Sequence, residues 1–161
     1  RACSLNPSLR ERYAVKVFQL LNEKGRAAGL LFNTIFEKQG PPFGGTKAEY
    51  EKLFEPIFIL KQFDICQNSV KPRLGNELFI EMEKKNINED FVKIYAVSGI
   101  TCSGCKSTVT NNLMEVVGVL MVSINRDFTE VMVVSKQTAE LQQLQQAIAH
   151  DSKYQLSETK N

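Results

Sequence analysis

The stretch Gly99-Ile100-Thr101-Cys102-Ser103-Gly104-Cys105 determines how the second half of this 161-residue chain can be interpreted. It follows an apolar, strand-like run at residues 91–97 and precedes a helix-like run at residues 106–116. Two thiols at a loop-to-helix junction can bind one soft metal ion, because the positive end of the helix dipole favours thiolate over thiol. Thiolates select copper(I) and zinc over magnesium or calcium. A thioredoxin-like redox pair is the alternative interpretation of the same spacing.

The segments that follow the motif predict a small α+β unit. Strand-like runs at residues 120–124 and 130–135 are separated by the turn Asn125-Arg126-Asp127. A helix is expected over residues 138–149, and a short strand over residues 154–156 closes the unit. One face of this helix would carry the apolar residues Leu141, Leu144, Ala147 and Ile148. The order strand–helix–strand–strand–helix–strand predicts a ferredoxin-like βαββαβ fold. The cysteines lack the apolar or aromatic frame of a thioredoxin-like site, which disfavours the redox interpretation.

Residues 92–156 resemble the heavy-metal-associated domain of metallochaperones and metal-pumping ATPases. The resemblance rests on the Gly-x-Thr-Cys-x-x-Cys core, on the Gly118-Val119 turn, and on Ala147-Ile148 with the later Tyr154. It implies a soft-metal site, of the copper(I) or zinc type, formed by Cys102 and Cys105. Because two thiolates leave room for a third ligand, it also implies a protein partner for metal transfer.

Two positions depart from that family's pattern. Ile100 stands where the family usually has methionine, which is an exchange of one apolar core residue for another. The last loop, residues 150–153, is longer where the family places a glycine and a Tyr or Lys near the metal. His150, the single histidine, lies in this loop. We expect it to be an exposed residue at a helix end, where it favours the dipole, with a metal-ligand role as the alternative.

The first ninety residues predict a mixed α/β unit. An amphipathic helix is expected over residues 8–23, with Tyr13, Val17, Leu20 and Leu21 on its apolar side. The apolar run at residues 29–36 predicts a strand covered on both faces. Thr46 is expected to cap a helix over residues 47–54, and antiparallel strands are expected at 57–65 and 77–82. This is the pattern of the closing half of a doubly wound sheet with an antiparallel edge.

Three motifs in this part resemble the C-terminal half of the thiopurine S-methyltransferase family. They are Leu5-Asn6-Pro7-Ser8-Leu9-Arg10, Gly40-Pro41-Pro42-Phe43-Gly44-Gly45, and Asn68-Ser69 with the later Pro72-Arg73-x-Gly75-Asn76-Glu77. The family comprises S-adenosylmethionine-dependent enzymes that methylate thiols, halides, or oxidised selenium and tellurium. The resemblance covers about residues 2–84 and implies a methyltransferase relationship.

The resemblance implies roles for few residues. Arg10 matches an arginine beside cofactor and substrate, so it is a candidate cofactor-binding residue. Pro42 and Phe43, with Pro41, would form a rigid lip over the substrate pocket. Arg73 is expected to be a solvated turn residue. The family's cofactor-binding strands would lie before position 1, so we expect S-adenosylmethionine binding and turnover only when that N-terminal half is supplied.

Composition limits the remaining possibilities. The formal net charge of +2 does not favour nucleic-acid binding, and no apolar run approaches the ~20 residues of a membrane span. Four cysteines are too few for a disulfide framework, and we expect Cys3 and Cys66 to be small buried hydrophobic residues.

A reducing, cytoplasmic location fits a thiol metal site. The predicted organisation is a partial methyltransferase-like domain at 1–84, a linker at 85–90, and a metal-binding domain at 91–161.

Overall fold

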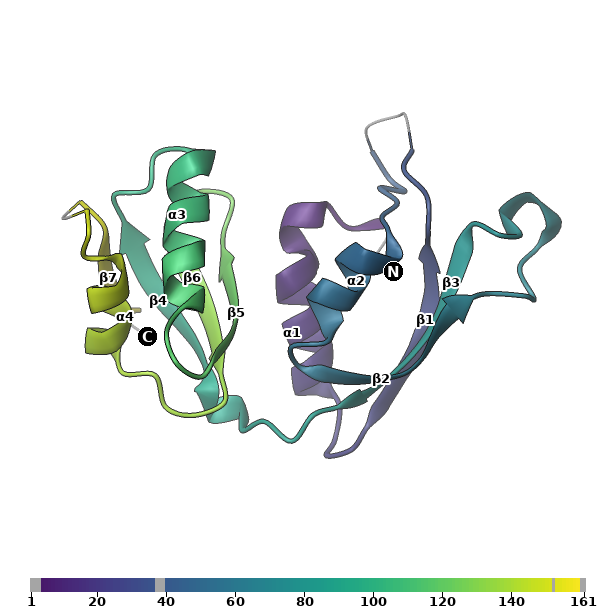
Figure 1. Cartoon of the computed structure of the whole chain (residues 1–161), viewed down its shortest axis with the longest axis horizontal. Coiled ribbons are helices and arrows are strands. Elements are labelled where there is room, and N and C mark those ends of the chain that lie inside the picture. Colours follow the sequence, from purple (N-terminus) through teal and green to yellow (C-terminus); the bar gives the residue numbers. More distant parts are fainter. Residues whose placement is uncertain (1–3, 37–39, 152, 160–161) are drawn as a thin grey trace. The chain divides into compact units, whose positions relative to one another are not determined.

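A computed structural model describes residues 4–36, 40–151 and 153–159. Cys3 lies outside these residues. The chain divides into two compact units, Arg1–Asn86 and Ile87–Asn161. The linker at 85–90 stays a prediction. Figure 1 shows the elements of both units.

The first unit is a three-stranded sheet covered on one face by two helices. Its helices are α1 (Arg10–Leu20), which follows a short 3₁₀ turn, and α2 (Lys47–Phe54); its strands are β1 (Arg26–Phe32), β2 (Phe58–Ile65) and β3 (Glu77–Lys84). The strand order is β1-β3-β2, and both pairings are antiparallel. Phe18 of α1 and Phe54 of α2 each meet Phe58 of β2 edge to face, with ring centroids 6.1 Å apart, so both helices pack on the same face. The mixed α/β prediction is confirmed.

The helix α2 forms because its first turn is capped as the sequence predicts. The side chain of Thr46 accepts a hydrogen bond from the backbone of Glu49, and the carboxylate of Glu49 accepts one from the backbone of Thr46. This reciprocal capping box satisfies two N–H groups that would otherwise lack a helical partner. The helix then buries Tyr50, Leu53 and Phe54 against the sheet.

Two details of the first unit differ from the sequence predictions. The buried face of α1 consists of Arg10, Ala14, Val15 and Phe18, whereas Leu20 is 72% exposed, so the predicted apolar side was wrong. The strand predicted at 29–36 is β1, which starts and ends earlier. β1 is an edge strand that pairs with β3 alone among the described strands, and Leu30 and Ile35 are exposed, so coverage on both faces was also wrong.

The second unit is a four-stranded antiparallel sheet with both helices on one face (Figure 1). Its elements are β4 (Val92–Ser98), α3 (Ser103–Met114), β5 (Val119–Ile124), β6 (Glu130–Ser135), α4 (Leu141–Ile148) and β7 (Gln155–Glu158). The strand order β5-β6-β4-β7 confirms the ferredoxin-like fold. Val109 and Leu113 of α3 and Leu144 and Ile148 of α4 are fully buried and form one core with the inward side chains of the sheet.

Candidate metal centre

The cysteine motif lies where β4 ends and α3 begins. Gly99 starts this loop with a φ of +87°, a conformation that side-chain-bearing residues rarely adopt. A Cβ atom there would also collide with the backbone carbonyl of Lys153. Ile100 follows with only 7% of its surface exposed and joins the core, as an apolar residue at this position should. Glycine and isoleucine therefore fix the loop from which the thiols project.

Cys102 and Cys105 occupy different positions on the helix. Cys102 is the N-cap of α3, with extended backbone, and its sulfur accepts a hydrogen bond of 3.2 Å from the backbone N–H of Cys105. Helix α3 begins at Ser103, three residues before the predicted start, so Cys105 lies within the first turn. Cys102 is exposed, whereas Cys105 is half-buried and packs against the core.

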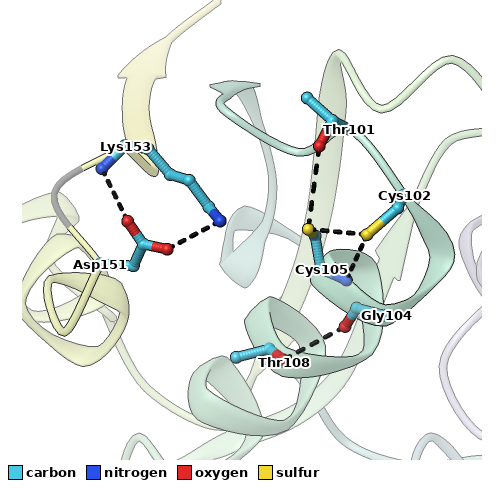
Figure 2. A network of polar contacts seen from close by, with 7 residues as sticks. All are labelled: Thr101, Cys102, Gly104, Cys105, Thr108, Asp151 and Lys153. Atoms are coloured by element: carbon cyan, nitrogen blue, oxygen red, sulfur yellow. Dashed lines mark hydrogen bonds and ion pairs between the residues drawn. The ribbon is translucent and has the colours of Figure 1, made fainter.

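The two sulfur atoms are 2.8 Å apart, and both thiols are free (Figure 2). Two metal–sulfur bonds of about 2.3 Å allow sulfurs up to roughly 4.6 Å apart to share one ion. The donor set therefore fits a soft cation, because it consists of two thiols at the positive end of a helix. No cluster of three or more His, Cys, Asp or Glu side chains suited to a metal occurs among the residues that the structure describes.

Hydrogen bonds around Cys105 favour its thiolate form. The bond from the Cys102 thiol contributes most, followed by bonds from the Tyr154 hydroxyl and from the backbone of Thr101; together they lower the pKa of Cys105 from 9.0 to about 6. The Thr101 hydroxyl is also 3.9 Å from the Cys105 sulfur. The same contact with Cys105, and then burial, raises the pKa of Tyr154. Near neutral pH, Cys105 is therefore mostly in the thiolate form, which is the form that binds metals.

The loop before β7 supplies residues that the motif alone does not reveal. Lys153 forms an ion pair with Asp151 at 2.8 Å, and its ammonium group lies 4.9 Å from the centre of the Tyr154 ring. The ion pair with Asp151, followed by the Tyr154 hydroxyl, raises the pKa of Lys153, and Lys153 in turn lowers the pKa of Asp151. The family pattern of a Tyr or Lys near the metal was the signal that could have identified these residues.

The other sulfur and nitrogen candidates lie elsewhere. His150 is exposed just after α4, as expected for a helix-end residue. Cys66 follows β2 and is partly exposed, so its prediction as a buried residue was wrong. Within the described residues, neither belongs to a metal-ligand cluster.

In the first unit, Arg10 is buried and supports the proline-containing loop. Its guanidinium group donates a hydrogen bond of 2.5 Å to the carbonyl of Gly44 and lies 5.5 Å from the centre of the Tyr50 ring. Pro42, with Pro41, lines a cavity of about 730 Å³ beside β1. Phe43 is half-buried and is not among the residues that line this cavity.

Arg73 is exposed in the turn before β3, as predicted, and it makes two side-chain contacts there. Its guanidinium group pairs with the buried carboxylate of Glu77 at 3.4 Å and lies 5.5 Å from the centre of the Phe32 ring. Both Arg73 and Glu77 line the same cavity as Pro42. The prediction of a solvated turn residue is therefore confirmed, whereas the pairing with a buried acid four residues further along the chain was not predicted.

Comparison with protein families agrees with both resemblances. Residues 2–88 match the thiopurine S-methyltransferase family. The chain belongs to that family. Residues 94–155 match the heavy-metal-associated domain, so the chain joins a methyltransferase-related unit to a metal-binding one. No curated protein is a significant match to the chain. None of the described helices reaches the length and hydrophobicity needed to traverse a lipid bilayer.

Proposed function

We propose that this chain binds one soft metal ion, copper(I) or zinc in type, between the sulfur atoms of Cys102 and Cys105. The observation that supports the proposal most is the pair of free thiols 2.8 Å apart at the start of α3, in a unit that matches the heavy-metal-associated domain. Soft thiolates prefer such ions to magnesium or calcium.

The ion is cargo rather than a structural centre in this proposal. Two protein sulfurs leave coordination positions that a ligand from a partner protein can fill, so the ion can pass by ligand exchange. Cys102 is exposed and accessible to such a partner. The thiols must stay reduced for this function, which favours a reducing compartment such as the cytoplasm.

Replacing the two cysteines tests the proposal. We expect the full chain to bind one copper(I) ion in competition with a chromophoric chelator, and a variant with Cys102→Ser and Cys105→Ser to lose that binding. Cys66→Ser is the matched control, because Cys66 is also a free and partly exposed thiol, and it should bind as the wild type does. Unchanged copper(I) affinity in the double variant would reject the site.

The redox alternative predicts different behaviour in the same titration. A thiol–disulfide protein would form a reversible Cys102–Cys105 disulfide and couple to a reductase, and it would not need to compete with a strong chelator for copper(I). Strong retention of the ion by the reduced chain therefore favours metal binding. Weak retention combined with efficient turnover by a reductase would favour the redox function.

A second function rests on residues 2–88. We propose that this unit takes part in methyl transfer from S-adenosylmethionine to a thiol or metalloid acceptor, with Arg10 near the cofactor and Pro42 and Phe43 near the acceptor. The family match and the cavity of about 730 Å³ lined by Pro42 support this role. The metal-binding unit would then sense or present a soft element.

Cofactor binding separates the two functions. We expect no measurable S-adenosylmethionine binding by the 161-residue chain in calorimetry, and turnover only when a cofactor-binding segment of this family is added. Methyl transfer by the chain alone would show that this expectation is wrong. Copper(I) binding in the absence of S-adenosylmethionine would show that metal binding does not depend on the methyl-transfer function.

A further inference from the structure

The second unit contains a cavity to which the proposed functions assign no role. Its volume is about 300 Å³, near the lower end of the range for ligand pockets, so it suits a molecule with few non-hydrogen atoms. The residues that line it come from β4, from β6, from the turn before β4 and from the turn before α4. They include Asp90, Phe91, Lys93, Tyr95, Val133 and Ala139.

This cavity and the cysteine motif lie at opposite ends of β4. Lys93 and Tyr95 line the cavity near the start of the strand, whereas the motif follows the end of the strand at Ser98. The stretch from Lys93 to Ser98 spans roughly 17 Å of extended chain. Lys93 pairs with Val133, and Tyr95 and Val133 both belong to the core beneath the helices. The cavity therefore lies on the helix-covered face of the sheet, away from the thiols.

Tyr95 gives the cavity a buried polar group. The side chain is 7% exposed, and its hydroxyl forms no hydrogen bond with any residue that the structure describes. Buried polar groups normally have a partner, so this hydroxyl is available to a ligand. Burial, followed by the negative charges of Glu158 and Glu140, raises the pKa of the hydroxyl. It therefore stays protonated at neutral pH and can both donate and accept a hydrogen bond.

The rim of the cavity carries one charge of each sign. Asp90 and Lys93 are exposed and line the cavity, and within the described part of the chain neither forms an ion pair. The carboxylate can bind an ammonium group, and the ammonium group of Lys93 can bind a carboxylate. Phe91, which is half-buried, and Val133, which is buried, add apolar surface to the wall.

We propose that this cavity binds a small zwitterion with an apolar side chain, which is the chemistry of a free amino acid. Asp90 binds the ammonium group of the ligand, Lys93 binds its carboxylate, and Phe91 and Val133 contact its side chain. This site is separate from the proposed metal site, because the two share no residue.

The surrounding charges predict how the ligand is oriented. Glu158 and Glu140 act on the Tyr95 hydroxyl, so this side of the cavity favours positive over negative charge. We therefore expect the ammonium group to lie toward Tyr95, whose hydroxyl oxygen accepts a hydrogen bond from it. The carboxylate of the ligand would stay near Lys93 at the rim.

The experiment titrates the reduced, metal-free full chain with L-leucine and follows the backbone amide resonances by NMR. We expect shifts at residues 93–95 and 135–139 and none at residues 101–105. Two analogues test the need for both charges, since 3-methylbutylamine lacks the carboxylate of leucine and 4-methylpentanoate lacks its ammonium group. Each should bind about three- to tenfold more weakly than leucine, as expected for the loss of one charged contact.

Three variants test the assigned contacts. Tyr95→Phe should lower leucine affinity about three- to tenfold without lowering the free energy of unfolding, because the hydroxyl bonds to the ligand and to no described residue. Lys93→Met should weaken leucine binding and leave 3-methylbutylamine binding unchanged, because only leucine has the carboxylate. Lys106→Met is the matched control, since it removes one positive charge from α3 beside the cysteine motif, and it should bind leucine as the wild type does.

Three results would overturn the inference. The first is the absence of shifts at residues 93–95 and 135–139 up to the solubility limit of leucine. The second is an analogue that binds as tightly as leucine, and the third is an equal loss of leucine and 3-methylbutylamine binding in Lys93→Met. Any of these would leave the proposed metal binding unaffected, because the copper(I) titration depends on other residues.

Discussion

The thiolate state of Cys105 gives the sharpest test of the site's electrostatics. Its pKa falls from 9.0 to about 6, and the largest cause is the hydrogen bond from Cys102. At pH 7 these values correspond to a thiolate fraction of about nine-tenths, against about one-hundredth for an unperturbed thiol. Because the folded-state pKa is lowered, the thiolate is present above about pH 6 and is lost as the pH falls through that value.

Alkylation of the metal-free, reduced chain measures this fraction. The rate of Cys105 modification by iodoacetamide, followed by mass spectrometry of the peptide, should rise with a midpoint near pH 6. Cys102→Ala removes the strongest hydrogen bond and should move the midpoint upward, toward the value of an ordinary thiol. Tyr154→Phe should move it in the same direction by less, because its bond ranks second.

Two results would refute this reasoning. A wild-type midpoint at the ordinary thiol value would mean that the hydrogen bonds do not favour the thiolate. A midpoint that does not move in Cys102→Ala would mean that another group, and not the neighbouring sulfur, sets the acidity of Cys105. Modification of Cys66, a free thiol of the other unit, in the same samples controls for the amount of active reagent.

Four further variants, one of them a control, test the fold by chemical denaturation. Gly99→Ala should lower the free energy of unfolding of the second unit by about 2–3 kcal/mol, because Gly99 has a φ of +87° and an added Cβ would collide with the Lys153 carbonyl. Gly104→Ala is the control: an added Cβ there would meet only a sulfur at 3.9 Å, so the free energy of unfolding should change by less than about 1 kcal/mol. Leu113→Ala should cost about 2–5 kcal/mol, since this side chain is fully buried; a smaller loss would contradict the packing described for α3. Thr46→Ala should cost the first unit about 1 kcal/mol through loss of the capping box, and no change would mean that the cap is not formed.

Local signals in the sequence predicted the elements that depend on neighbouring residues. The helix at 47–54 was predicted with its observed bounds, because Thr46 and Glu49 form a cap within one turn. The strand at 130–135 and the antiparallel pairing of β2 with β3 were also predicted correctly. The cysteine spacing indicated the loop-to-helix junction, although it missed that Cys102 itself caps the helix.

Features that depend on distant residues could not be predicted in this way. The buried side of α1 is set by the contact of Phe18 with Phe58, 40 residues later in the chain. It is not set by Leu20, the last residue of the helix, or by Leu21, which lies just beyond it. Arg10 is buried because the Gly44 carbonyl and the Tyr50 ring receive it. The contact of Lys153 with Gly99 likewise joins segments that lie far apart in the sequence.

The unequal settings of the two cysteine sulfurs have a consequence for the direction of any transfer. The sulfur of Cys102 faces solvent at the tip of α3, while that of Cys105 is anchored by Tyr154 and the Thr101 backbone. A thiol of a partner would reach the sulfur of Cys102 first, and the sulfur of Cys105 would stay bound to the ion until the exchange is nearly complete. In the proposed transfer, the ion would therefore leave the sulfur of Cys102 first and that of Cys105 last.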